Sequence, residues 1–364
     1  MYLAIRDLRF AKGRFLLMGG VVALITVLLV LLSGLTAGLG NQSTSALAAL
    51  HADQIVFGAP AGGGAKASFT ESEVTRAQLS EWSAAEGVAR AELLGISQSR
   101  FQSVGTTGTP TGTASVAVFG TEGSGLAPAP VADGTVVVGS SLARDLELEV
   151  GSRATIGGTA LTVSSVVPDQ WYAHTGVVWT TLTDWRTLAH IGTAGAAATV
   201  IAVTADTGHS PDTAATNTAA GTLSTTRDGS FQALGSYKSE NGSLLLMQAF
   251  LYGISALVIV AFLTVWTVQR TRDIAVLKAL GGSSGYVLRD AMVQAAIVLF
   301  TGAAAGGAVG IAGGAVASGA APFLLTPTTT LLPVAGIVVL GLAGAALATR
   351  GITRVDPLLA LGGN

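Results

Sequence analysis

Three long stretches without a charged residue constrain this chain more than any other feature. They run over Phe15–Leu50, Gly242–Val268 and Ala291–Thr349. A helix needs about 20 consecutive apolar residues to cross a bilayer, so the first two stretches each predict one span. The third stretch is too long for one helix, and three prolines divide it: Pro322, Pro327 and Pro333. The pattern therefore predicts four transmembrane helices.

The distribution of charge orients these spans. Segments 1–14, 269–290 and 350–364 together carry ten Lys and Arg against four Asp and Glu, whereas 51–240 carries nine against seventeen. Because Lys and Arg collect on the cytoplasmic side, we expect both termini and the connection between the second and third spans in the cytoplasm. The long acidic segment is then extracytoplasmic. A net charge of −2 argues against nucleic acid as a partner.

The expected organisation follows in order along the chain. It consists of a cytoplasmic amphipathic helix at 1–14, transmembrane helix 1 at 15–40, an extracytoplasmic domain at 41–240, transmembrane helix 2 at 242–268, a short cytoplasmic helix at 270–285, transmembrane helix 3 at 290–319, transmembrane helix 4 at 333–349 and a cytoplasmic tail at 350–364. The alternative for the start is a cleaved signal peptide. The apolar region of a signal peptide spans about 7–15 residues, so the much longer run here favours a retained helix.

The segment 41–240 predicts a mixed α+β domain. Short β-branched runs between glycines, such as TASVAVFG, GTVVVGS and TGVVWTT, are typical of strands. A helix is expected over FTESEVTRAQLSEWSAAEG, capped by Thr70 or Ser72. Two more are expected over SSLARDLEL and over TLTDWRTLAHIG, the latter capped by Thr183 or Asp184. The predicted fold class is an α-helical membrane protein with four transmembrane helices and an extracytoplasmic mixed α+β domain.

The sequence lacks the motifs of catalytic and metal sites. GAPAGGGAKAS has Ala65 and Ala67 around Lys66, where a phosphate-binding loop needs Gly and Ser or Thr, so it predicts a linker. The histidines are scattered and lack the i, i+4 spacing that places two imidazoles on one helix face. Cysteine is absent, and no serine is placed by sequence next to a plausible base. We therefore expect no catalytic residue, no metal site and no intrinsic cofactor.

The third predicted span carries glycines at four-residue spacing: Gly302, Gly306, Gly310 and Gly314. This spacing leaves one helix face without side chains, so a neighbouring helix can approach closely. The stripe predicts a packed interface and leaves open whether its partner belongs to the same subunit or to a second copy. The alternative is that glycine is simply frequent in membrane helices.

The connection QRTRDIAVLKALGGSSGYVLRD predicts a short amphipathic helix with Ile274, Leu277 and Leu280 near one face. Such a helix suits docking into another protein's groove, or forms only a solvated elbow between two spans. The segment is similar to the signature R-x-[RK]-E-I-A-[VIL]-L-[KR]-A-[LI]-G-A-[ST] of the FtsX/MacB-like permeases of ATP-binding cassette transporters. Asp273 stands where this family usually has Glu, and Gly282 where Ala is common.

Three further segments resemble the same family. The tail ITRVDPLLAL is similar to its closing x-x-x-[VI]-[DN]-P-x-x-A-L. The run VVVGSSLARDLELEVGSRATIGGTALTVSSVV is similar to its external core, with Gly151 at the family's glycine. The opening LAIRDLRFAKGRFLL looks most like the DevC/HrtB branch, which includes haem exporters.

The resemblance implies the permease subunit of an exporter in the bacterial cell membrane, with no enzymatic activity of its own. It implies a homodimer that works with two copies of a separate ATPase subunit and is surrounded by membrane lipid. It also implies that the helix at 270–285 receives the ATPase stroke, through Arg270, Arg272, Asp273, Ile274, Leu277, Lys278 and Gly281. The HrtB-like opening implies haem export. Alternatives are a mechanotransmission permease that regulates an extracytoplasmic partner such as a cell-wall hydrolase, and a receptor-like sensor without an ATPase.

If haem is the cargo, the outer mouth of the second span carries candidate ligands in GSYKSENGSLLLMQAFLYG. Haem iron accepts His, Met, Tyr or Cys, so Tyr237, Met247 and Tyr252 are the candidates to ligate it. Lys238 could pair with a propionate and Phe250 could stack on the ring. The alternative is that Met247 and Phe250 face lipid while the two tyrosines form an interfacial belt.

Overall fold

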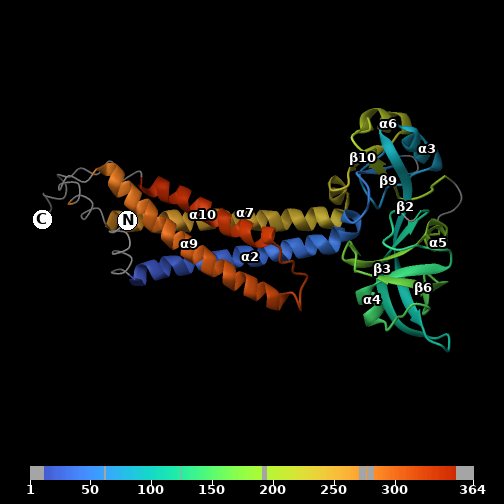
Figure 1. Cartoon of the computed structure of the whole chain (residues 1–364), viewed down its shortest axis with the longest axis horizontal. Helices are drawn as coiled ribbons and strands as arrows, with labels where there is room; N and C mark the ends of the chain where they lie inside the picture. Colours follow the sequence, from blue (N-terminus) through green and yellow to red (C-terminus); the bar gives the residue numbers. More distant parts are fainter. Residues whose placement is uncertain are drawn as a thin grey trace. The chain divides into compact units, whose positions relative to one another are not determined.

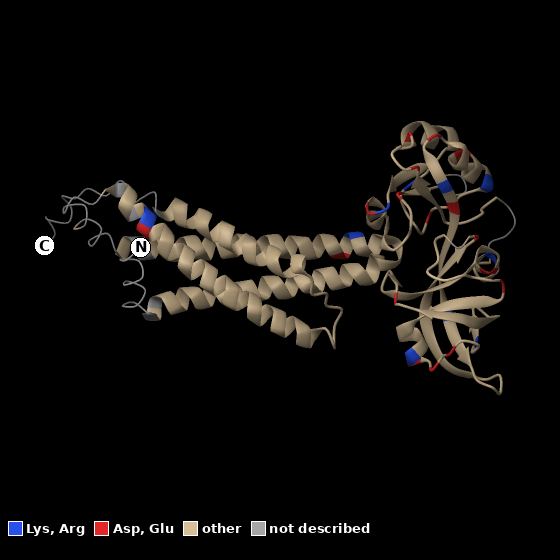
Figure 2. Ribbon diagram, in the orientation of Figure 1, with Lys and Arg blue, Asp and Glu red and all other residues tan. Residues whose placement is uncertain are grey.

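The structure, a computed structural model, describes residues 12–60, 63–123, 125–190, 195–269, 276 and 283–349. It divides into two compact units. The first is helical and takes in 1–39 and 242–364, and the second, which we call the external unit, takes in 40–241. Figure 1 shows their elements along the chain, and Figure 2 shows that charged side chains are frequent in the external unit and sparse on the long helices.

The helical unit is built from four long apolar helices: α2 (Lys12–Ala48), α7 (Gly235–Gln269), α9 (Ser284–Ala317) and α10 (Pro327–Thr349). Within the described residues, these four are the helices long and apolar enough to cross a membrane. The last turns of α2 and the first turns of α7 belong to the external unit. These two helices therefore contribute residues to both units.

Helix α10 begins at Pro327, six residues before the predicted start at Pro333. Its start is capped reciprocally, because Thr329 N–H donates to Thr326 Oγ1 (3.2 Å) and Thr326 N–H donates to Thr329 Oγ1 (2.9 Å). Proline fits the first helical position because an N–H there has no helical partner. Pro333 lies inside the helix, so this proline does not divide the stretch as the sequence predicted.

The external unit contains one sheet of ten strands: β1 (Gln54–Phe57), β2 (Val88–Val104), β3 (Pro110–Thr121), β4 (Thr135–Gly139), β5 (Arg153–Ile156), β6 (Thr159–Val167), β7 (Trp171–Tyr172), β8 (Thr175–Thr181), β9 (Val200–Ala205) and β10 (Leu223–Thr226). Strands β2, β3, β8, β4, β6 and β5 pair in that order, and β5 also pairs with β2. These six strands thus close into a barrel. The first half of β2 extends beyond the barrel and pairs with β9.

Four short helices connect the strands: α3 (Arg76–Ala84), α4 (Ser140–Asp145), α5 (Leu182–Leu188) and α6 (Thr213–Ala220). The 3-10 helix η1 (Gly229–Ala233) lies between β10 and α7. The predicted caps of α3 and α5 are both wrong. Thr75 caps α3 in a full capping box with Gln78, and Thr181 caps α5 by accepting a hydrogen bond from Asp184 N–H. In each case the cap is the residue directly before the first helical turn, and the sequence pattern alone does not show where that turn begins.

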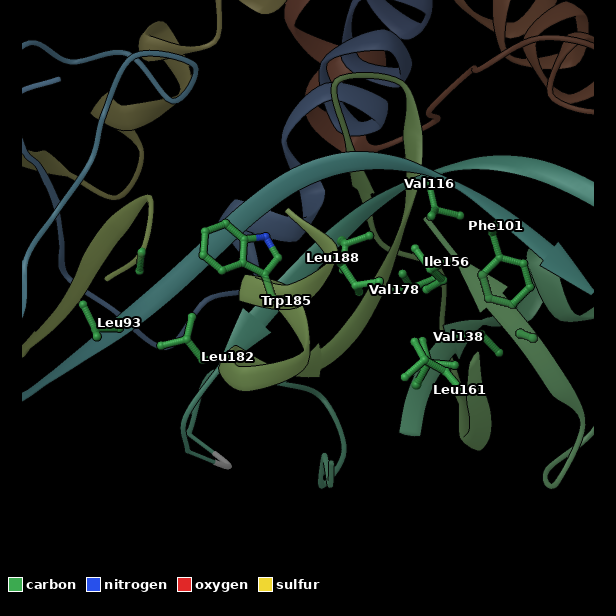
Figure 3. Packing of buried hydrophobic residues seen from close by; sticks show 14 of the residues in the cluster. Leu93, Phe101, Val116, Val138, Ile156, Leu161, Val178, Leu182, Trp185 and Leu188 are labelled. Atoms are coloured by element: carbon green, nitrogen blue, oxygen red, sulfur yellow. The ribbon is translucent and has the colours of Figure 1, made fainter. Parts of the chain in front are cut away.

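One hydrophobic cluster combines the inside of the barrel with the packing of α3 and α5 on the sheet (Figure 3). Phe101, Val116 and Ile156 are among its members and have no exposed surface. Trp185 of α5 is 1% exposed and lies against Gly95 of β2 and Gly120 of β3, where any side chain would overlap the indole. These two glycines therefore create the space that the indole of Trp185, one of the two tryptophans of the cluster, fills.

A second cluster covers the opposite face of the sheet and includes Leu47 and Leu50 at the end of α2. Edge-to-face aromatic contacts run through it, from Phe69 to Tyr172 (5.9 Å between ring centres) and from Tyr172 to Phe119 (5.4 Å). Such pairs add stability beyond the area they bury. The end of α2 is therefore part of the hydrophobic core of the external unit.

Candidate functional site

The residues expected to couple to the ATPase lie outside the described part of the chain. They are Arg270, Arg272, Asp273, Ile274, Leu277, Lys278 and Gly281. The predicted amphipathic helix at 1–14 and the tail at 350–364 also fall almost entirely outside it. Their proposed roles stay predictions.

The five haem candidates are divided between two units and two faces of α7. Met247 and Phe250 lie three residues apart on the exposed face of the helix, with exposed fractions of 56% and 64%. Tyr252 packs on α10, because a side chain at Gly336 would lie about 3.0 Å from its ring. Tyr237 belongs to the external unit, where its ring contacts Phe231, and Lys238 is exposed there. Within the helical unit, Met247 and Phe250 therefore share one face of α7, whereas Tyr252 lies on another.

The inward face of α7 carries polar groups that the sequence analysis did not single out. Gln248 Nε2 donates to Thr36 Oγ1 on α2 (3.0 Å). Ser255, with no exposed surface, donates to the carbonyl of Leu251. The bond from Gln248 to Thr36 joins two helices, and interhelical hydrogen bonds of this kind fix helices against one another in lipid. Gln248 could have been found as a strongly polar residue inside an apolar run.

The glycine stripe of α9 packs mainly on α2 of the same chain. A side chain at Gly306 would overlap the carbonyl oxygen of Ala23, and one at Gly310 would lie 2.9 Å from Val30. Gly302 faces Val22, and Gly314 faces the ring of Phe323 in the loop before α10. The contact left open by the sequence is thus within one subunit for all four glycines.

Two glycines of α2, which the sequence analysis did not single out, contact the same loop before α10. Gly34 and Gly38 lie one turn apart on α2, and a side chain at either would overlap Phe323 or the backbone of Pro322. Leu324 N–H also donates to the carbonyl of Gly34 (3.0 Å). The four-residue spacing of these glycines is visible in the sequence, but the sequence does not show that the loop before α10 packs against them.

A carboxylate lies near the start of α9. Asp290 Oδ2 accepts a hydrogen bond from Gln294 Nε2 (2.8 Å), and Gln294 has no exposed surface. Asp290 Oδ1 is buried without a hydrogen-bond partner in the part of the chain that the structure describes. Ionisable side chains within membrane-spanning helices are rare and commonly functional. The sequence analysis had counted Asp290 only as a cytoplasmic charge.

The tip of the β7–β8 hairpin joins the external unit to the ends of α2 and α7 that belong to it. Tyr172 pairs with Thr175, so Ala173 and His174 form a two-residue turn. Their N–H groups donate to the carbonyls of Ser43 and Gln42 on α2, both at 3.0 Å. His174 Nε2 lies 3.1 Å from Ser43 Oγ and 2.9 Å from Glu240 Oε2 on α7.

Both residues of this turn adopt positive φ, +46° for Ala173 and +61° for His174. Turns of this kind favour Asn-Gly, and a non-glycine residue held in such a conformation costs on the order of 1–3 kcal/mol. Tyr172, which precedes the turn, is buried, and burial raises the pKa of its hydroxyl. A buried strand end and bonds to α2 hold the turn in place. Sequence reasoning treated His174 as one of four scattered histidines.

A cavity of about 690 Å³ opens at the barrel end formed by the end of β2 and the starts of β3 and β5. Its charged lining residues are Asp145, Glu147 and Arg153, and all three are exposed. None of the haem candidates lines it. No group of three His, Cys, Asp or Glu side chains suited to a metal ion occurs within the described residues.

Comparison with known families decides what kind of protein carries these features. Residues 14–220 match the model of the MacB-like periplasmic core domain, and residues 245–357 match that of the FtsX-like permease C-terminal region. The chain belongs to the MacB/FtsX-like permease family. The predicted resemblance to this family is thereby confirmed.

Relatives within the family differ in how much of the chain they match. The putative hemin transport permease HrtB of Staphylococcus epidermidis is 29% identical over 143 residues, 39% of this chain and 41% of that protein. Its counterpart in Staphylococcus haemolyticus is 32% identical over 130 residues, 36% of this chain and 37% of that protein. The chain thus matches about two-fifths of the length of these relatives. An uncharacterized ABC transporter permease of Mycobacterium bovis is 24% identical over 380 residues, 100% of this chain and 99% of that protein.

Among solved structures, the periplasmic region of MacB from Actinobacillus actinomycetemcomitans covers 50% of this chain and 92% of its own length. Its identity is 14% and its TM-score 0.35. A likeness at this level carries no argument about function.

The family's glycine at Gly151 has a physical reason in this structure. Gly151 has φ of +94°, a conformation that side chains disfavour, and its N–H donates to the carbonyl of Val163 (2.8 Å). The bond ties the segment between α4 and β5 to strand β6. Glycine here serves the shape of the barrel, whereas the glycines of α9 serve helix packing.

Proposed function

We propose that this permease exports haem from the outer leaflet of the membrane. The observation that carries the proposal is the sequence similarity to the hemin transport permeases of two Staphylococcus species. Haem is a flat apolar ring with two carboxylates and an iron that accepts a thioether. A helix face that offers apolar contacts and one thioether suits such a ligand.

The exposed face of α7 supplies these groups. Met247, Phe250, Ile254 and Leu257 follow one another at spacings of three and four residues and are all more than half exposed. We propose Met247 as the iron ligand and Phe250 as the ring contact. Tyr252 packs on α10 and Tyr237 on Phe231, so we give these two tyrosines and Lys238 no part in the first contact.

In this proposal two copies of the chain work with two copies of a separate ATPase. The charge distribution supports cytoplasmic termini and an extracytoplasmic external unit. The connection after α7 would receive the ATPase stroke, with Asp273 and Lys278 beside its apolar face. The chain itself then needs no catalytic residue.

A haem titration of the purified full-length protein in lipid nanodiscs tests the proposal. We expect a shift of the Soret band in the parent and at least a tenfold weaker affinity in Met247→Leu, which removes the thioether while keeping an apolar side chain of similar size. Met292→Leu is the matched control, because Met292 packs in the helical core, and it should bind like the parent. No Soret shift in the parent would contradict haem as cargo.

The second candidate is a permease that moves no substrate and instead reshapes its external unit for a partner such as a cell-wall hydrolase. It is favoured by the contribution of α2 and α7 to both units, including the core position of Leu47 and Leu50. This candidate predicts no haem binding in the titration. It also predicts that Asp273→Lys with Lys278→Glu abolishes activation of the partner.

A further inference from the structure

We propose that His174 forms a latch that holds the ends of α2 and α7 together in the external unit. The latch consists of His174 on the β7–β8 turn, Ser43 on α2 and Glu240 on α7. This inference goes beyond the proposed function, because it holds whether the permease moves a substrate or only transmits force.

The contacts of one ring atom define the latch. His174 Nε2 lies within hydrogen-bond distance of Ser43 Oγ (3.1 Å) and of Glu240 Oε2 (2.9 Å). The two partners lie on helices separated by almost two hundred residues of sequence. About a third of each side chain of the His174–Glu240 pair remains exposed, so the contact can open without disturbing the hydrophobic core.

Backbone hydrogen bonds fix the ring at this place. The N–H groups of Ala173 and His174 donate to the carbonyls of Ser43 and Gln42, and Trp171 N–H donates to Ser45 Oγ (2.8 Å). All of these acceptors lie on α2. The turn is therefore anchored to α2, and the side chain of His174 is the group that reaches from it to α7.

The strained backbone indicates that the residue at 174 is selected for its side chain. Asn or Gly would adopt φ of +61° with less strain, yet neither has an imidazole. Strain of this kind persists where the surroundings hold it and is found at functional positions. A turn that served only to reverse the chain would have no need of histidine here.

Distance measurements between the two helix ends test the latch. The chain has no cysteine, so Asn41→Cys and Ser236→Cys introduce the only two labelling sites, both exposed, one on each helix. Spin labels on the full-length protein in nanodiscs then report their separation by pulsed electron resonance. We expect one narrow distance distribution in the otherwise unchanged protein.

His174→Gly relaxes the turn and removes the ring, and Glu240→Ala removes the partner on α7. We expect either change to at least double the width of the distribution. Two matched controls should leave it unchanged. Ala173→Gly relaxes the neighbouring residue of the same turn but keeps the ring, and Glu71→Ala breaks the exposed Lys66–Glu71 pair (2.8 Å) in a loop remote in sequence from both helix ends.

Two outcomes would overturn the latch. One is a parent-like distribution in both His174→Gly and Glu240→Ala. The other is equal widening in Ala173→Gly and His174→Gly, which would assign the effect to the turn and not to the ring. Circular dichroism of each variant verifies the fold, and Ser43→Ala, which keeps all backbone contacts, gives an intermediate width if the latch is correct.

Discussion

The external unit and the helical unit are stabilised by opposite uses of side-chain size. In the external unit, large side chains such as Trp82, Trp185 and Phe101 fill the core, and two glycines make room for Trp185. In the helical unit, glycines of α9 bring backbone against the backbone of α2. In water, burial of apolar area drives packing, whereas lipid offers no such gain and helices associate through close contact. The environment of a unit, water or lipid, therefore determines whether large apolar side chains or small residues stabilise its packing.

The largest effect is expected from removing an aromatic anchor of the external unit. Trp185→Ala should lower the free energy of unfolding by about 3–5 kcal/mol, because the buried indole is lost and Gly95 and Gly120 have no side chains to fill the cavity. Fluorescence of the remaining external tryptophans in a urea titration measures this loss. The half-buried Trp171 is the control, and equal losses from the two alanine variants would contradict the anchoring role of Trp185.

An intermediate effect is expected from the opposite change in the helical unit, the addition of a side chain. Gly306→Ala should lower stability by about 1–3 kcal/mol, because its methyl group would overlap the rigid carbonyl of Ala23. The measurement is thermal unfolding in nanodiscs followed by circular dichroism. Gly313→Ala on the same helix is the control, since its nearest neighbour would lie 3.6 Å away. Similar melting of both variants would show that small residues do not govern packing in this unit.

The smallest effect is expected at a helix cap on the surface of the external unit. Thr75→Ala should cost about 1 kcal/mol, because it removes the side-chain oxygen that accepts a hydrogen bond from Gln78 N–H (3.2 Å). Thr70→Ala, at the cap predicted from the sequence, should cost clearly less, since Thr70 is exposed and its hydroxyl pairs with that of Ser68 (3.1 Å). A urea titration resolves the two, and a larger loss at Thr70 would contradict the capping box.

Sequence reasoning located helices and strands correctly where a whole segment favours one environment, either lipid or water. Uncharged runs of more than 20 residues located four helices, and β-branched runs located β3, β4 and β8. It missed β9 and the closure of the barrel through β2 and β5, because the pairing of distant strands leaves no local pattern. It also placed two helix caps a few residues away from the real ones.

The candidate functional site was likewise predicted only in part from the sequence. The sequence identified the family motif and the glycines of α9, but not that Met247 and Tyr252 lie on different faces of α7 with different neighbours. The turn at His174 could not be predicted from the sequence either. Its positive φ values and its bonds to Ser43 and Glu240 exist only when three distant segments meet.

The sequence by itself determined the class of this protein, since charge and apolar length decide which segments favour lipid, and a contiguous motif carries the family. The tertiary structure alone decided which side chains meet. It placed α9 on α2 of the same chain, put Met247 and Tyr252 on different faces of α7 and assembled the His174 contact. The physical reason is range: partition between water and lipid is a property of each segment, whereas packing and hydrogen bonding depend on atoms that only the fold brings together.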